Sequence, residues 1–306
     1  MKYDVVIIVG PTASGKTSLS VELAKALNTE IINADSQQLI KGLDIGTAKV
    51  TETEMQGVRH NLLDVIQVGQ DYSVSEYRDD CLKQIERIKA DGKIPVVVGG
   101  TGLYVNSIVY DYTYGGTEKD DSLRDEYFKL ATIKGNEYVY DILKSLDPKS
   151  ASEIHPNNLK RVIRAIEIAK NSDKMKSEQS LKPSEQIHPL IIGLTIERDE
   201  LFKRIDERVD LMVEQGLQTE TDHLNQHGFY KNRITLPIGY SEWAGYYDGT
   251  LTLDQVIEQI KLDTRHYAKR QMTWFKKLDN VHWFDPIKTP LSEILNSTMQ
   301  LLNEGK

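Results

Sequence analysis

The run MKYDVVIIVGPTASGKT, residues 1–17, decides the fold because an apolar strand pattern leads directly into a phosphate-binding loop. Residues 4–9 are rich in Val and Ile, which predicts a buried strand. Residues 10–17 then match G-x-x-x-x-G-K-[ST], and a helical pattern begins at Lys16. This order predicts backbone amides that converge on phosphate oxygens at a helix N-terminus. The expected diphosphate site is the whole loop: Gly10, Pro11, Thr12, Ala13, Ser14, Gly15, Lys16 and Thr17.

The side chains of this loop also suggest a metal. Lys16 supplies a point charge for phosphate, and the Thr17 hydroxyl is the expected ligand of Mg²⁺, the expected cofactor. Most P-loop NTPases add an apolar strand that ends in Asp, but residues 95–98 here lead into Gly-Gly-Thr-Gly with no acid. Asp64, in the run NLLD, is a weak substitute for that acid, and Asp35, which follows the apolar residues 31–34, is a better-placed one. This absence indicates a leaving-group reaction other than nucleotide hydrolysis, while a glycine-rich turn without a ligand is the plain alternative.

Alternating apolar and helical patterns predict an α/β fold. The sheet is expected to be parallel and P-loop NTPase-like, with helices on both of its faces. Residues 117–188 show helical periodicity without a convincing strand, and the polar stretch at 171–186 is expected to be a mobile loop. The predicted domains are a first core part at 1–116, an all-helical insertion at 117–188, and a mainly helical second core part at 189–306. The expected strands are 4–9, 30–34, 95–98 and 190–196, and the first helices are 16–27 and 75–90.

Composition excludes several classes of protein. The chain has 306 residues, a net charge of −8 and one cysteine, Cys81. One cysteine rules out an internal disulfide framework and offers no zinc-ligand set, and it favours a reducing compartment. No apolar run approaches the roughly 18 residues that cross a bilayer. We therefore expect a cytoplasmic protein with no membrane partner. The acidic total disfavours nonspecific binding to polyanions.

Two strand ends carry polar residues that suggest catalysis. Asp35 follows the second expected strand and should lie at the carboxyl edge of the sheet, where open α/β folds bind ligands. It is a candidate general base, a metal partner or the N-cap of a following helix. Gln37 and Gln38 offer amides that can pair with a base edge. Thr101 is flanked by glycines that permit close approach to a ligand, although a tight turn explains them equally.

Three groups of cations are candidate anion-binding faces. Lys160, Arg161 and Arg164 lie on an expected helix that begins near residue 158, where they either clamp phosphates or form a solvated face. Arg204 and Arg208 are four residues apart on another helix and reach either a diphosphate or neighbouring acids. In the segment 264–278, cations alternate with aromatic residues that either stack on RNA bases or belong to the core. The cations of this last segment are Arg265, Lys269, Arg270, Lys276 and Lys277, and its aromatic residues are Tyr267, Trp274 and Phe275.

In their order, these motifs closely resemble the tRNA dimethylallyltransferase family over almost the whole chain. The resemblance is carried by GPTASGKT, INADSQQ with GLDIGTAK, GKIPVVVGGTGLY, DP with IHPNNLKRVIRAIE, IGYSEW and TRHYAKRQMTWF. It implies transfer of a dimethylallyl group from dimethylallyl diphosphate to N6 of the adenosine next to the anticodon, on its 3′ side, with Mg²⁺. The sequence contains no zinc-finger segment of the kind found at the carboxyl end of the eukaryotic enzymes, so the resemblance is to the bacterial type of the family. A monomer that binds the tRNA anticodon loop is expected.

The resemblance also implies roles for individual residues. Residues 10–17 would hold the diphosphate, and Arg208 with Arg204 would steady it as a leaving group. Asp35 would take the N6 proton, and Thr101 would contact the reacting region. The residues expected at the tRNA, including the basic segment near the carboxyl end, are Asp35, Ser36, Gln37, Gln38, Thr101, Arg124, Lys160, Arg161, Val162, Ile163, Arg164, Arg265, Lys269 and Arg270.

Two other functions use the same loop. A P-loop kinase of small molecules or nucleotides would bind ATP there, and its turnover would not depend on RNA. A non-catalytic RNA-binding NTPase switch would bind tRNA, hydrolyse a nucleotide and leave the base unmodified. Both alternatives keep the α/β core and differ from the transferase in the acceptor.

Overall fold

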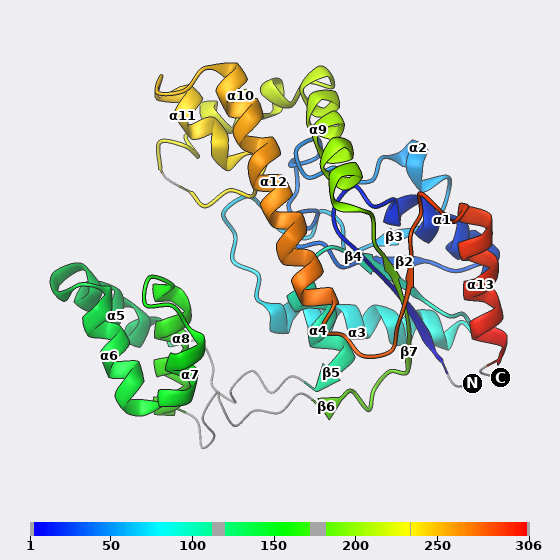
Figure 1. Ribbon diagram of the computed structural model, residues 1–306, viewed down its shortest axis with the longest axis horizontal. Coiled ribbons are helices and arrows are strands. Elements are labelled where there is room, and N and C mark those ends of the chain that lie inside the picture. Colours follow the sequence, from blue (N-terminus) through cyan, green and yellow to red (C-terminus); the bar gives the residue numbers. More distant parts are fainter. Residues whose placement is uncertain (1–2, 112–119, 172–181, 233, 305–306) are drawn as a thin grey trace. The chain divides into compact units, whose positions relative to one another are not determined.

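A six-stranded parallel sheet is the centre of the chain in the computed structural model, which describes residues 3–111, 120–171, 182–232 and 234–304 (Figure 1). The strand order is β3-β2-β4-β1-β7-β8, and because every neighbouring pair is parallel, each connection between paired strands is a crossover. The parallel α/β sheet expected from the sequence is confirmed. The strands are β1 (Val5–Val9), β2 (Ile31–Asn33), β3 (His60–Asn61), β4 (Val96–Gly99), β7 (Pro189–Leu194) and β8 (Val281–Phe284).

The central strand β1 explains why the sheet forms where it does. All five of its residues are completely buried, as expected for a parallel strand covered on both faces. Val6 stands between Val96 of β4 and Leu190 of β7. Helices α1 (Lys16–Ala26) and α13 (Leu291–Glu304) cover the face of Val6, and α3 (Val74–Ala90) and α4 (Gly102–Val109) cover the other face.

Capping residues in the sequence fix where several helices begin. Ser73 and Glu76 form a capping box at α3, and Thr252 and Gln255 do the same at α12. Helices α9 and α12 pack side by side, and a buried cluster joins them to the short elements between them. The remaining helices of this part are α2 (Glu52–Met55), α9 (Arg198–Glu214), α10 (Leu217–Gln226), η2 (Ser241–Trp243), α11 (Ala244–Tyr247) and α12 (Leu253–Phe275).

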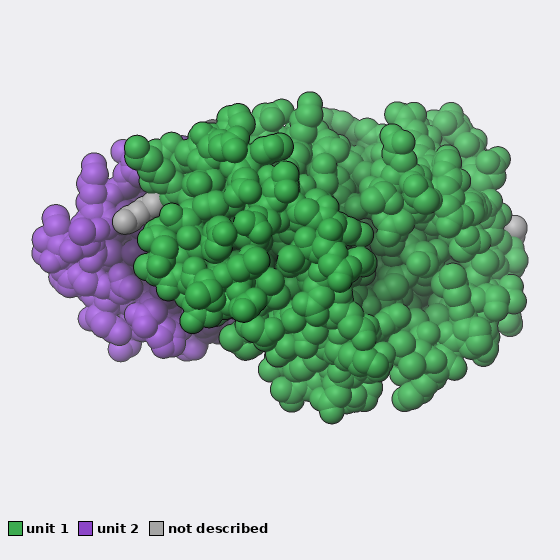
Figure 2. All heavy atoms as spheres, turned by 90° about the horizontal axis from the view of Figure 1, so that it is seen from above, with its two compact units in different colours: residues 1–109, 184–306 green, residues 110–183 purple. Residues whose placement is uncertain are grey.

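The chain divides into two compact units, shown in different colours in Figure 2. One unit consists of residues 1–109 and 184–306, and the other of residues 110–183. The second unit is a helical bundle with its own apolar core, which includes Val139, Leu143 and Ile166. Its boundaries fall a few residues before the insertion expected at 117–188. Its helices are α5 (Asp121–Lys134), α6 (Asn136–Leu146), α7 (Pro148–Glu153) and α8 (Leu159–Asn171).

The structure corrects the expectation that residues 117–188 contain no strand. Lys182–Pro183 forms β6, which pairs antiparallel with β5 (Tyr110–Asp111) and so joins the two ends of the helical unit. A two-residue strand uses backbone groups and carries no apolar period, so its sequence gives no signal. Most of the mobile loop expected at 171–186 lies outside the described residues. Strands β3 and β8 were also not expected.

No helix in the described ranges has both the length and the apolar character that a membrane crossing requires.

Candidate active site

The loop of residues 10–17 lies between the end of β1 and the start of α1, as its motif predicts. Gly15 precedes the helix with φ of 85°, a left-handed conformation that favours glycine. The Lys16 side chain folds back over its own loop and donates hydrogen bonds to the carbonyl oxygens of Gly10 (3.0 Å) and Pro11 (2.7 Å). The loop therefore presents an ammonium group and the N-terminal amides of α1 at one place, which is an anion site.

Lys16 has an unusual protonation equilibrium. The pKa of Lys16 is lowered to about 8, chiefly because the side chain is buried; the Asp35 carboxylate opposes this shift and the Arg208 guanidinium adds to it. These influences show that the three charged side chains share one neighbourhood. Lys16 is still mainly protonated at neutral pH, and the charge of a bound phosphate would stabilise that form.

Asp35 stands at the carboxyl end of β2, where the sequence predicts it. Its amide donates to Asn33 Oδ1 (3.0 Å), and its Oδ1 accepts from the amide of Gln37 (3.0 Å). Residues 36–39 form a turn, so Asp35 closes a turn and does not cap a helix. Burial raises the pKa of the Asp35 carboxyl, against the hydrogen bonds of the following amides and the charge of Lys16. A raised pKa suits a proton acceptor at neutral pH.

Thr101 joins the end of β4 to the end of β2. Its hydroxyl accepts from the amide of Ser36 (2.9 Å) and donates to the Ser36 hydroxyl (3.1 Å). The neighbouring Gly100 must be glycine, since a Cβ atom there would lie 3.2 Å from Asp35 Oδ2 and 2.2 Å from Gln271 Nε2. Tyr267 of α12 is close enough to Thr101 and Gln271 for both to affect its pKa, and burial raises that pKa, so its hydroxyl stays protonated. The two strand-end motifs are thus one connected site.

Gln271 is a site residue that none of the sequence motifs indicates. Its Oε1 accepts from the amide of Thr12 (2.8 Å) in the phosphate loop, and its Nε2 donates to the carbonyl of Gly100 (2.8 Å). Its side chain is buried. Gln271 therefore ties the phosphate loop to the end of β4 from α12. The only feature of the sequence that could have indicated Gln271 is its place within TRHYAKRQMTWF. Its hydrogen-bond partners are far from it along the chain, so no local pattern points to them.

Arg204 and Arg208 both face the phosphate loop from α9. Arg204 Nη1 lies 3.4 Å from the Ala13 carbonyl, and Arg208 Nη1 lies 3.4 Å from Thr12 Oγ1. Burial lowers the pKa of Arg208. The nearby acid Asp206 pairs instead with Arg265, at 2.6 Å. Surface pairing therefore does not account for the two arginines, and their direction favours an anion bound at the loop.

Lys16, Asp35 and Arg208 line one cavity of about 410 Å³ within the unit that contains the sheet, whereas Thr101, Arg204 and Gln271 are not among its lining residues. A smaller pocket of about 50 Å³ shares Thr12, Asp35 and Arg208 with it. The wall of the large cavity is part polar and charged and part apolar. The polar lining includes Thr12, Lys16, Thr17, Asp35, Gln38 and Arg208, and the apolar lining includes Ile45, Ala48, Val50, Leu211 and Met212. The apolar lining of the small pocket includes Ile205, Val209, Met212, Ile238 and Ile260.

The oxygen atoms in the cavity fit Mg²⁺ better than a soft metal. The Thr17 hydroxyl and the Asp35 carboxylate both line it. No cluster of three or more His, Cys, Asp or Glu side chains with metal-site geometry occurs in the described part of the chain. Mg²⁺ commonly takes only one or two protein ligands together with phosphate oxygens and water. The donor set therefore suits an ion that arrives with a diphosphate.

The residues expected to contact tRNA from the helical unit fall into two groups. Lys160 and Arg161 are exposed on α8. Arg124 and Arg164 instead both bind the buried carboxylate of Glu167, Arg124 at 2.8 Å, so each already has a partner. Their half-buried guanidinium groups remain accessible at the surface of this unit.

Val162 and Ile163 correct the expectation that the whole run 160–164 contacts RNA. Their side chains are 0% and 1% exposed in the core of the helical unit. Adjacent residues on a helix point in different directions, so only part of such a run can face a ligand.

The basic part of α12 is likewise divided. Arg265 pairs with Asp206, and both Arg265 and Lys269 lie over the ring of Phe202. Arg270 lies 5.7 Å from the ring centre of Tyr267. The two aromatic residues near the helix end also differ, because Phe275 is fully buried and Trp274 is 39% exposed. Phe275 is therefore a core residue, and Trp274 offers part of its ring to the surface.

Comparisons with known proteins agree with this geometry. Residues 38–278 match the model of the family described as IPP transferase. The chain is 46% identical to a tRNA dimethylallyltransferase of Acetivibrio thermocellus, covering 92% of this chain and 91% of the relative. It is 44% identical to the tRNA dimethylallyltransferase of Bacillus subtilis, covering 93% and 91%.

Solved structures show the same likeness. A full-length tRNA isopentenylpyrophosphate transferase of Bacillus halodurans superimposes with a TM-score of 0.73 at 42% identity, covering 99% of this chain and 98% of that one. A eukaryotic dimethylallyltransferase, solved acting on tRNA, superimposes with a TM-score of 0.78 at 29% identity. The comparison covers 97% of this chain and 77% of the eukaryotic one.

Proposed function

The chain belongs to the IPP transferase family, and on that basis we propose that it transfers a dimethylallyl group from dimethylallyl diphosphate to tRNA. The acceptor is N6 of the adenosine next to the anticodon on its 3′ side, and diphosphate is released. One observation carries this proposal: a phosphate loop, a buried arginine and a carboxyl of raised pKa line a single cavity. A tRNA substrate fits the cytoplasmic location expected from the sequence.

Neutralisation of the leaving group is the main task of the site. In the transfer, the bond between the allylic carbon and the diphosphate oxygen breaks as the bond to N6 forms. Negative charge grows on the diphosphate, and Lys16, Arg208 and the loop amides are placed to stabilise it. Arg204 adds a second guanidinium at the same loop. Mg²⁺, held by Thr17 and the diphosphate, would supply further neutralising charge.

Asp35 is the proton acceptor in this mechanism. The exocyclic amine of adenine is a poor nucleophile and must lose one proton as it is alkylated. The carboxyl of Asp35 lines the cavity beside Lys16, and Thr101 anchors the adjoining turn through Ser36. The N6 proton passes to the Asp35 carboxylate, so charge and atoms balance: alkylated adenosine, diphosphate and a protonated Asp35 result.

The acceptor base must leave its stack to reach Asp35. Extruding a base costs a few kcal/mol, and less in a single-stranded loop than in a duplex. Exposed Lys160 and Arg161 on α8 and the cations of α12 would bind the RNA backbone. Local basic groups of this kind suffice for an acidic protein, because an anticodon loop presents few phosphates at one time.

The kinase alternative is not favoured. All the relatives compared above are named as transferases that modify tRNA. In addition, β4 ends at Gly99 and continues into Gly100 and Thr101, so no acid follows it for the water shell of a nucleotide-bound metal.

A label-transfer assay tests the function directly. With radioactive dimethylallyl diphosphate and unmodified tRNA, we expect label in the RNA only when Mg²⁺ is present, because the diphosphate must be neutralised to leave. A tRNA with guanosine in place of the acceptor adenosine is the control and should take up no label. Absence of transfer, together with ATP turnover on a small acceptor, would replace the transferase with the kinase.

Replacing Arg161 with alanine should weaken tRNA binding with little effect on turnover at saturating tRNA. The slope of log Kd against log salt concentration should become shallower by about 0.7 for one lost phosphate contact. Arg161 is chosen over Arg164 because Arg164 also balances the buried Glu167. Filter binding over a salt series measures the slope, with Lys144→Ala on α6 as a control. An unchanged slope would assign Arg161 to a solvated face.

A further inference from the structure

The segment of residues 43–49, LDIGTAK, lines the cavity although it belongs to no helix or strand. Asp44, Ile45, Thr47, Ala48 and Lys49 all contribute to the lining. Such a wall needs another means of holding its shape. The sequence motif that contains it has no role in the mechanism above, and neither has the motif IGYSEW at 238–243.

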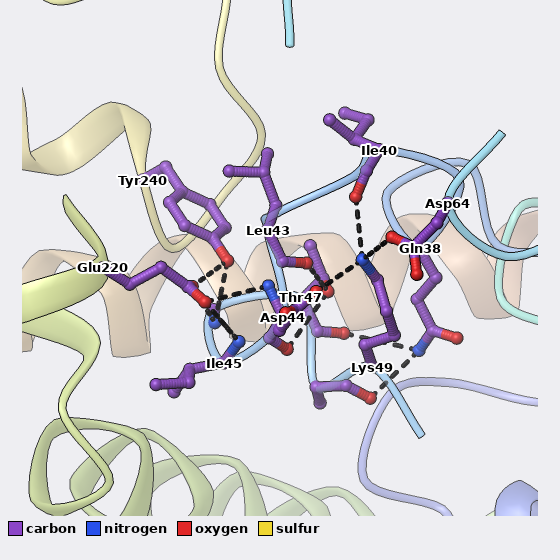
Figure 3. Close-up of polar contacts among 12 residues, drawn as sticks. Gln38, Ile40, Leu43, Asp44, Ile45, Thr47, Lys49, Asp64, Glu220 and Tyr240 are labelled. Atoms are coloured by element: carbon purple, nitrogen blue, oxygen red, sulfur yellow. Dashed lines mark hydrogen bonds and ion pairs between the residues drawn. The ribbon is translucent and has the colours of Figure 1, made fainter. Parts of the chain in front are cut away.

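Glu220 of α10 holds the middle of this segment (Figure 3). Its carboxylate accepts hydrogen bonds from three consecutive backbone amides, those of Asp44 (3.0 Å), Ile45 (3.1 Å) and Gly46 (3.3 Å). Successive amides directed at one anion form a nest, and charge-assisted bonds of this kind are stronger than neutral ones. Within the described residues, the only other side chain that accepts from these amides is the uncharged Tyr240 hydroxyl, so Glu220 fixes the backbone of this turn from outside the segment.

Tyr240 completes the attachment. Its hydroxyl accepts from the Gly46 amide (3.0 Å) and donates to Glu220 Oε1. Its ring is fully buried against Gly46, where an added Cβ would lie 2.6 Å from a ring carbon. Burial and the adjacent Glu220 raise the pKa of Tyr240, so the hydroxyl keeps the proton that it donates. Glu242 accepts from the amide of Gly239 (2.9 Å) and stiffens the turn that carries Tyr240.

The other end of the segment controls Gln38. The carbonyl oxygens of Thr47 and Ala48 accept from Gln38 Nε2, at 3.4 Å and 3.0 Å. Two carbonyl partners require the amide nitrogen, which leaves Gln38 Oε1 to accept from a donor in the cavity. Gln38 also lines this cavity and follows Asp35 by three residues. The orientation of its amide therefore depends on the position of the 43–49 backbone.

We propose that Glu220 and Tyr240 are positioning residues: they hold the 43–49 segment as a wall of the cavity and thereby orient Gln38 towards the acceptor base. This inference rests on the proposed function for what Gln38 contacts, while the attachment of the segment itself does not depend on it. The inference assigns a role to two motifs that are distant along the chain. Gly46 and Tyr240 are 194 residues apart, so the spacing of residues in the sequence gives no sign of their contact.

Amide hydrogen exchange tests the attachment without any substrate. In Glu220→Gln, one acceptor oxygen replaces two, and an NH₂ group faces the three amides. We expect faster exchange at Asp44, Ile45 and Gly46 than in the wild-type protein. Glu214→Gln is the matched control, because Glu214 is exposed near the end of α9 and should leave exchange unchanged. Unchanged exchange in Glu220→Gln would overturn the proposal, whatever the activity of the protein.

Kinetics then test whether the segment acts through Gln38. We expect Glu220→Gln to lower kcat/KM for tRNA by about 10- to 100-fold, because a small displacement of a side chain that positions the substrate has an effect of this size. In a Gln38→Ala background, the same substitution should add little further loss, because its target is already gone. Multiplied losses in the double variant would show a merely structural role and overturn the proposal.

Tyr240→Phe provides a second variant in case Glu220→Gln fails to fold. It keeps the ring against Gly46 and removes only the hydroxyl, so we expect a smaller loss that again disappears in the Gln38→Ala background. A loss that persists in full in that background would contradict the proposed route. If the wild-type protein transfers no dimethylallyl group at all, the proposed function fails, and the exchange experiment still decides the attachment.

Discussion

Replacing Asp35 with alanine is expected to lower kcat by about 10²- to 10⁴-fold, the usual contribution of a general base. The reason is that the Asp35 carboxylate lines the cavity, acts on the charge of Lys16 and precedes Ser36, whose amide donates to Thr101. Binding of tRNA should change little, since the proton transfer occurs only in the transition state. Single-turnover rates and filter binding measure the two effects separately.

Asp79→Ala serves as the control for this substitution. Asp79 is an exposed carboxyl on α3, outside the cavity lining, and its removal should leave the rate unchanged. Normal turnover in Asp35→Ala would reject Asp35 as the base. Lost tRNA binding with an unchanged rate at saturation would instead assign Asp35 to recognition of the base edge.

Replacing Lys16 with alanine should lower the rate of transfer by about 10²- to 10³-fold, comparable to removing one preorganised donor from an oxyanion site. Lys16 is the charged side chain within the phosphate loop itself, and its ammonium already lies against two loop carbonyls. Affinity for the donor should also fall, because the ground-state diphosphate is charged. Lys25→Ala, at the far end of α1, is the control and should behave as the wild-type protein.

The same lysine predicts a pH dependence. A lysine is charged below its pKa, and that of Lys16 is lowered to about 8 in the free protein. The value of kcat/KM, which reports the free enzyme, should therefore decrease as pH rises through about 8. In Lys16→Arg the guanidinium stays protonated, so this decrease should move to higher pH. A decrease at the same pH in Lys16→Arg would assign it to another group.

The sequence predicted the parts of this protein in which neighbouring residues act together. The phosphate loop is a contiguous motif, and its glycines, lysine and threonine have fixed roles whatever surrounds them. The buried strands β1, β2, β4 and β7 show apolar runs of their own, and Asp35 and Thr101 follow two of them directly. Parallel strands that end at one edge then bring these two residues together, which is a rule of the fold.

Other parts of the sheet could not be predicted from local patterns. Strand β8 (VHWF) has one exposed and three half-buried residues at the edge of the sheet, so no continuous apolar run marks it. Strand β3 is two residues long. Both are fixed by pairing with a neighbour already in place, β8 with β7 and β3 with β2, and such pairing uses backbone groups that every residue has.

Sequence alone therefore determined the class of fold, the phosphate loop and the two strand-end residues, because each depends on contacts among a few consecutive residues. Only the tertiary structure decided the roles of Gln271, Glu220 and Glu167. Each is a single polar residue on a helix, and its pattern along the chain resembles that of an ordinary surface position. Gln271 reaches Thr12 across 259 residues, and Glu220 reaches Ile45 across 175. Hydrogen bonds over such separations form only when the packed helices have brought the two partners together. The spacing of residues along the sequence therefore does not predict them.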